Sequence, residues 1–146
     1  MVMPDNPKEN AYVFESEVLS PFAKLKPSQS YTFNYEWFST QIGGDFPVVE
    51  CTPTGIVCQP LQASKIAKGI QLQGRFGVFY EGDLVVKYLN ASGEIIDTET
   101  VVAKVTPLKG VNLSQKIKAV DGAASVALHL YDKNGQDIGQ LAKSSL

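Results

Sequence analysis

The fold of this chain is decided by two stretches that look like copies of one hairpin, VVKYLNASGEIID from Val85 to Asp97 and ALHLYDKNGQDIG from Ala127 to Gly139. Aligned on Gly93 and Gly135, they match in an apolar strand residue, in the polar residue that opens the turn and in an isoleucine after it. Each has the pattern of an alternating strand, a polar turn closed by glycine and a second strand. The two copies therefore predict an antiparallel β architecture.

The rest of the chain supports the same class. Short alternating segments are predicted as strands at Ala11 to Leu19, at Tyr31 to Phe38, on both sides of the Pro53-Thr54-Gly55 turn and at Gly69 to Tyr80. The stretch Gln62 to Gly69 is Ala-rich and is predicted to form one or two helical turns capped by Gly69. We expect an all-β fold, an antiparallel β-sandwich (immunoglobulin-like or jelly-roll) of about eight to ten strands with at most one short helix. Residues 1–10 are predicted to be a flexible N-terminal tail, and residues 11–146 a single sandwich domain.

The longest predicted strand has one apolar and one polar face. Gln71, Gln73 and Arg75 share the polar face, while the apolar face carries Ile70, Leu72, Phe76, Val78 and Tyr80. Gly74 and Gly77 inside this strand indicate a bulge or a close approach of another backbone.

The composition limits which partners and which cellular locations are expected for this protein. The net charge is −2, and Arg75 is the only arginine among 13 basic residues, so no basic cluster indicates nucleic-acid binding. No apolar run approaches the roughly 18 residues of a membrane span, and the N-terminus lacks the apolar region of a signal peptide. The expected location is therefore cytoplasmic or within a virion, or extracellular if a leader has been removed.

Cys51 and Cys58 flank the turn TPTGIV. A turn at Pro53 to Gly55 would bring the two strands together, which allows either a disulfide that staples this hairpin or two free buried thiols. Their spacing is not a zinc pattern, and no metal or other cofactor is predicted.

The segment from Gly82 to Gly139 resembles bacterial immunoglobulin-like sandwich modules, which often carry a strand ending in Tyr-Asp-x-x-Gly-x-x-Ile. The stretch LYDKNGQDIG, from Leu130 to Gly139, is similar to that pattern. The resemblance implies a sandwich fold and no particular activity. Ser125 stands where a tyrosine corner would place a tyrosine, so a jelly roll stays open beside the immunoglobulin-like topology.

Aromatic residues supply the candidate binding site. Tyr31, Phe33, Tyr35 and Trp37 share one face of the predicted strand Tyr31 to Phe38, and polar residues occupy the other face. This alternation is typical of a strand packed on a core. If the aromatic face is instead exposed, it would anchor a protein partner or stack on sugar rings. The binding candidates are Tyr31, Tyr35, Trp37 and Phe38.

Other groups of residues are weaker candidates for a functional site. Asp132, Asn134 and Asp137 resemble part of a calcium loop, but Asn134-Gly135 also has the sequence of a type I′ hairpin turn. The only histidine, His129, alternates with apolar neighbours and is expected on the more exposed strand face. No catalytic residue is therefore predicted, and the chain is expected not to be an enzyme.

The sequence favours a non-catalytic β-sandwich module for protein–protein assembly or surface attachment, as in envelope, cell-surface or virion accessory proteins. A protein partner or self-association is expected, without nucleic acid and without a membrane span. The alternative is a carbohydrate-binding module that uses the aromatic strand face. A hydrolase that uses His129 or Asp97 ranks third.

Overall fold

The computed structural model describes residues 17–146 of the 146-residue chain. The chain divides between Glu36 and Trp37 into two units. Residues 17–36, the described part of the first unit, are called the arm below. The predicted tail at residues 1–10 and most of the strand predicted from Ala11 lie outside the described residues, and no strand forms at residues 17–19.

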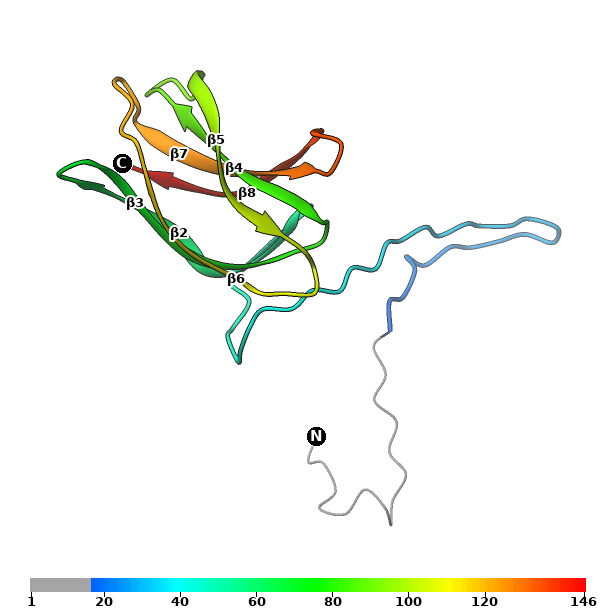
Figure 1. Cartoon of the computed structure of the whole chain (residues 1–146). Helices are drawn as coiled ribbons and strands as arrows, with labels where there is room; N and C mark the ends of the chain where they lie inside the picture. Colours follow the sequence, from blue (N-terminus) through cyan, green and yellow to red (C-terminus); the bar gives the residue numbers. More distant parts are fainter. Residues whose placement is uncertain (1–16) are drawn as a thin grey trace, which may run out of the picture. The chain divides into compact units, whose positions relative to one another are not determined.

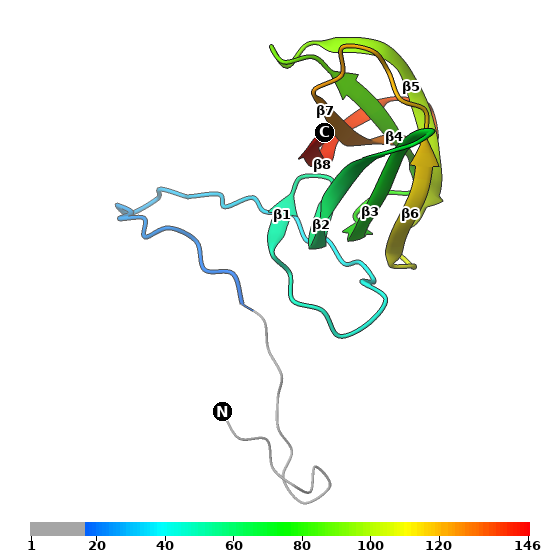
Figure 2. The ribbon, with the colours of Figure 1, turned by 90° about the vertical axis from the view of Figure 1, so that its left-hand side faces the viewer.

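The second unit is built from two four-stranded antiparallel sheets that share one core (Figure 1). Sheet A has the order β1-β2-β3-β6 and consists of β1 (Glu50–Thr52), β2 (Gly55–Ile66), β3 (Gly69–Val78) and β6 (Val111–Ile117). Sheet B has the order β5-β4-β7-β8 and consists of β5 (Ile95–Val105), β4 (Gly82–Leu89), β7 (Ser125–Asp132) and β8 (Asp137–Ser145). The view turned by 90° shows the two layers (Figure 2). This arrangement confirms the predicted all-β sandwich.

Sheet B consists entirely of the two hairpins that the sequence repeats. The first copy forms β4 and β5, the second forms β7 and β8, and β4 pairs with β7 at the centre of the sheet. In each turn the opening side chain, Asn90 or Asp132, accepts two backbone N–H groups through Oδ1. Gly93 and Gly135 take the left-handed conformation, with φ of 84° and 80°.

The turn type predicted at Asn134-Gly135 is wrong. A type I′ turn needs positive φ at both central residues, and among the described residues Ser28 is the only non-glycine with positive φ. The amide of Gly135 donates to the carbonyl of Asp132, and the amide of Asp132 donates to the carbonyl of Gln136. Three residues therefore form the loop, with glycine in the left-handed position that follows a type I turn.

The short helix predicted from Gln62 to Gly69 is also wrong. Residues 62–66 continue β2, a tight turn follows at residues 67–68, and Gly69 begins β3. The two strands pair from Gln62 opposite Gln73 to Ile66 opposite Gly69. Hydrogen bonds to β3 thus outweigh the weak helix preference of an Ala-containing segment.

The core lies between the sheets and follows the alternation seen in the sequence. The fully buried side chains from both sheets are Val57, Ile70, Leu72, Phe76, Val78, Leu84, Val86, Tyr88, Val126, Leu128, Leu130 and Leu141. Tyr88 is the largest of them, and its hydroxyl donates to the carbonyl of Lys118 at 3.0 Å. The apolar face predicted for β3 is confirmed, except that Tyr80 lies after the strand and is half-buried.

Gly77 of β3 marks a close approach of another segment, as the sequence predicted. A Cβ at Gly77 would lie 2.7 Å from a side-chain carbon of Thr40, and 3.1 Å from the carbonyl oxygen of Gln41. The amide of Gln41 also donates to the carbonyl of Pro107 at 2.8 Å. The segment that precedes β1 is therefore packed directly on sheet A and on the loop between β5 and β6.

A search of the described residues for a helix long and apolar enough to cross a membrane finds none.

Candidate functional site

The aromatic segment from Tyr31 to Phe38 forms no strand, contrary to the prediction. An alternating pattern favours a strand, but a strand forms only where a neighbouring strand completes its hydrogen-bond ladder. No ladder partner for this segment is present among residues 17–146. Tyr31, Tyr35, Trp37 and Phe38 are all exposed, while Phe33 is half-buried. The interpretation as core residues is therefore wrong, and the exposed state required for a binding role is present.

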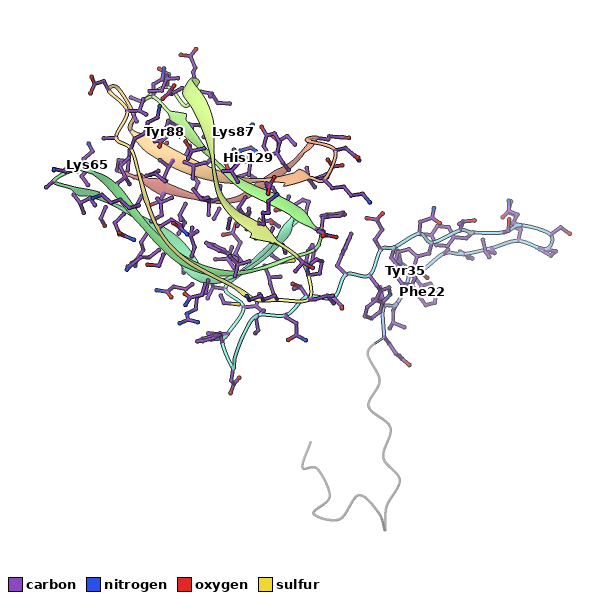
Figure 3. The ribbon with its side chains drawn as sticks, viewed as in Figure 1. Phe22, Tyr35, Lys65, Lys87, Tyr88 and His129 are labelled. Carbon is purple, nitrogen blue, oxygen red and sulfur yellow. The ribbon has the colours of Figure 1, made fainter. Side chains whose placement is uncertain are left out.

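Tyr31 and Tyr35 belong to the arm, which has an outgoing leg, a turn and a returning leg. The turn is closed by the amide of Gln29, which donates to the carbonyl of Lys26 at 3.0 Å. Tyr31 of the returning leg lines a hollow of about 340 Å³ with residues 20–23 and Leu25 of the outgoing leg. Figure 3 shows Phe22 and Tyr35 on the two legs. The arm thus brings apolar side chains from both legs into one small unit.

Trp37 and Phe38 belong to the second unit. The ring of Phe38 stacks on Phe79, with centroids 4.7 Å apart, and meets Tyr80 edge to face at 5.6 Å. Trp37 keeps 58% of its surface exposed. The four predicted binding residues are thus divided between the two units, and Phe38 already has aromatic partners in the sandwich.

The cysteine turn forms as a hairpin between β1 and β2. Cys51 is exposed and Cys58 is buried, and both are free thiols in the structure. The turn is held by hydroxyl groups: Thr52 Oγ1 accepts the amide of Gly55, and the buried Thr54 donates from Oγ1 to the carbonyl of Gln140 in β8. The first bond closes the turn, and the second fixes it to sheet B without a covalent link.

The weak calcium candidates are engaged in other bonds. The carboxylate of Asp132 accepts the amides of Asn134 and Gln136, and the side chain of Asn134 donates to the same carboxylate. The bond from the amide of Gln136, together with those from Asn134, lowers the pKa of Asp132, although burial acts in the opposite direction. Among residues 17–146, no group of three or more His, Cys, Asp or Glu side chains is placed to hold a metal ion.

Asp137 instead joins His129 and Lys87 on the outer face of sheet B. Figure 3 labels Lys87 and His129. Lys87 Nζ donates to Asp137 Oδ2 at 2.7 Å, and His129 Nδ1 lies 3.0 Å from the same oxygen. A carboxylate only accepts, so His129 donates from Nδ1. Burial raises the pKa of Asp137, but the bonds from Lys87 and His129 together lower this pKa by more than burial raises it. The pKa of Asp137 therefore lies below its ordinary value.

The sequence analysis missed this cluster. Lys87 is almost fully buried, although lysine seldom is, and its ammonium lies 5.2 Å from the ring centroid of Tyr131. The available signal was the hairpin repeat, because Lys87 and His129 occupy equivalent positions in the two copies. A charged residue and a titratable residue at one repeated position indicate a common polar site on one sheet face.

Comparison of the chain with protein-family models, with curated proteins and with solved structures finds no match in any of the three.

Proposed function

We propose that this protein is a non-catalytic β-sandwich module for protein–protein assembly, and that the arm is the part that contacts a protein partner. The observation that carries the proposal is the exposure of large apolar side chains along residues 17–36. Phe22 is fully exposed and Leu19 is 81% exposed, and the same holds in lesser degree for Val18, Leu25, Tyr31 and Tyr35. Monomeric proteins seldom display so many large apolar groups on one short segment.

The physical argument concerns what a partner would gain. Each fully buried Phe or Leu side chain stabilises an interface by about 1.5–3 kcal/mol relative to water exposure. Backbone groups of the arm that lack a strand ladder could bond to a partner at the same time. Aromatic residues are also the side chains that most often dominate interface energies.

The same geometry ranks assembly above the carbohydrate alternative based on the aromatic strand. A sugar platform needs rings displayed together on one rigid surface. Tyr31 and Tyr35 lie in the arm, whereas Phe38 packs on Phe79 in the sandwich. A protein partner needs no such platform, because it can bury the side chains of the arm one by one in pockets of its own surface.

Sedimentation velocity of the full chain, together with capture of partners from the native source, tests the proposal. We expect self-association or specific capture that is lost in the triple variant Phe22→Ser, Leu25→Ser, Tyr31→Ser. The control is Ile95→Ser, Val101→Ser, Leu108→Ser, which removes three exposed apolar side chains from the sandwich instead. Assembly should persist in this control.

The proposal fails if the unmodified protein is a monomer that captures nothing. It also fails if the arm variant and the sandwich variant assemble equally well.

A further inference from the structure

The outer face of sheet A carries a polar pocket that the assembly function does not use. Its volume is about 290 Å³, and its polar lining consists of Gln59, Gln73, Arg75, Asn112 and Ser114. Amide, hydroxyl and guanidinium groups line it, and no Asp or Glu does. The pocket is therefore positive and rich in groups that both donate and accept hydrogen bonds.

The strand register explains why these five side chains converge. Gln59 of β2 lies opposite Arg75 of β3, and Arg75 lies opposite Asn112 of β6, so the three form one row across the sheet. Gln73 and Ser114 form the next row on the same face. Neighbouring strands are about 4.8 Å apart and residues two positions apart about 7 Å, so the two rows frame an area of sugar-ring size.

Arg75 is held in this pocket by an aromatic ring. Its guanidinium carbon lies 4.6 Å from the ring centroid of Phe46, in the segment that precedes β1. No Asp or Glu within the described part of the chain forms an ion pair with Arg75. The only arginine of the chain is thus fixed by stacking, while no carboxylate of residues 17–146 neutralises its hydrogen-bonding edge.

We propose that this pocket binds a carboxylate-bearing sugar residue of an acidic glycan. The planar guanidinium of Arg75 matches a carboxylate with two parallel hydrogen bonds. The amides of Gln59, Gln73 and Asn112 supply the donors and acceptors that sugar hydroxyls require. A volume near the lower end for small-molecule pockets, about 300 Å³, suits a single ring rather than a long chain.

The pocket lies wholly in the second unit and includes no residue of the arm. The inference therefore goes beyond the proposed assembly role, and either can fail without the other.

The test is a nuclear magnetic resonance titration of the full chain with methyl glucuronide and, in parallel, with methyl glucoside. These probes differ only at C6, which is a carboxylate in the glucuronide and a hydroxymethyl group in the glucoside. We expect saturable shifts in the side-chain amide signals of Gln59, Gln73 and Asn112, with the glucuronide bound about tenfold or more tightly. Equal affinity for the two probes, or no saturable shift with the glucuronide at millimolar concentration, would overturn the proposal.

Three variants locate the effect. Arg75→Gln should reduce glucuronide affinity about tenfold or more, and Arg75→Lys should restore only part of it, because lysine keeps the charge but not the planar fork. Lys65→Gln is the control, since it removes an exposed positive charge from β2 outside the pocket. If Lys65→Gln weakens binding as much as Arg75→Gln, the attraction is general and the proposed site is wrong. The same conclusion follows if glucose 6-phosphate binds as tightly as the glucuronide.

Discussion

Val86 and Leu128 face each other across the ladder between β4 and β7, and they are also equivalent positions in the two hairpins. Leu128 follows Val86 by 42 positions, as Gly135 follows Gly93. A local two-fold axis therefore passes through this pair, and it exchanges β4 with β7 and β5 with β8. The sequence repeat is thus a symmetric sheet, in which β4 and β7 supply equivalent positions to the core: Leu84, Val86 and Tyr88 from one strand, and Val126, Leu128 and Leu130 from the other.

The centre of this symmetry should be important for stability. Leu128 is fully buried, so Leu128→Ala is expected to lower the free energy of unfolding by about 2–5 kcal/mol, through lost burial and the cavity that remains. Urea denaturation followed by circular dichroism measures the change. Leu108→Ala is the matched control, because Leu108 is 86% exposed and its removal should alter stability by less than about 0.5 kcal/mol. Equal effects of the two substitutions would contradict the core assignment.

The paired turns predict a pH effect at Asp132. The pKa of this carboxyl is lowered on folding, so its ionised form stabilises the fold at pH above its ordinary pKa, and this contribution is lost as pH falls through the lowered value. In the first hairpin the position equivalent to Asp132 is Asn90, whose side-chain oxygen accepts two backbone N–H groups in the same way. We therefore expect Asp132→Asn to fold, with slightly lower stability than the original chain at neutral pH.

The difference between Asp132→Asn and the original chain should close in acid, as measured by urea midpoints across the pH range. Asp132→Ala removes the hydrogen-bond acceptor and should be less stable than Asp132→Asn both in acid and at neutral pH. A constant difference between the original chain and Asp132→Asn at every pH would refute the role of the charge.

The cluster on the outer face of sheet B predicts a second electrostatic effect. Asp137→Ala takes the carboxylate away from the buried Lys87 and from His129, and should reduce the free energy of unfolding by about 1–3 kcal/mol. This range allows for the partial exposure of Asp137, whose side chain is 33% accessible. Lys104→Ala breaks a more exposed pair with Asp83 and should change stability by less than about 1 kcal/mol. Similar losses in both variants would mean that burial of Lys87 adds nothing.

Local sequence was sufficient to locate the two hairpins, though not to give the turn type at Asn134-Gly135, because strand alternation and turn residues are contiguous. It failed for Tyr31 to Phe38, where the alternation is that of a strand but the described chain supplies no ladder partner. It also failed for residues 62–66, where pairing with β3 decides the conformation. Lys87 and Asp137 meet His129 only through the register of three strands, and the stacking of Phe46 on Arg75 joins segments distant in sequence. Such contacts depend on tertiary structure and leave little trace in one sequence.

The packing of the segment before β1 can be tested at Gly110, in the loop between β5 and β6. A Cβ there would lie 2.4 Å from the backbone nitrogen of Gly43, so Gly110→Ala must displace the segment. We expect faster hydrogen exchange of the Gln41 amide, because its bond to the carbonyl of Pro107 is weakened. Gly93→Ala is the control, since a Cβ there meets no atom within 4 Å, and its strain from positive φ stays in the first hairpin. If Gly110→Ala leaves the exchange rate at Gln41 unchanged while Gly93→Ala raises it, the close contact between Gly43 and Gly110 does not hold the segment in place.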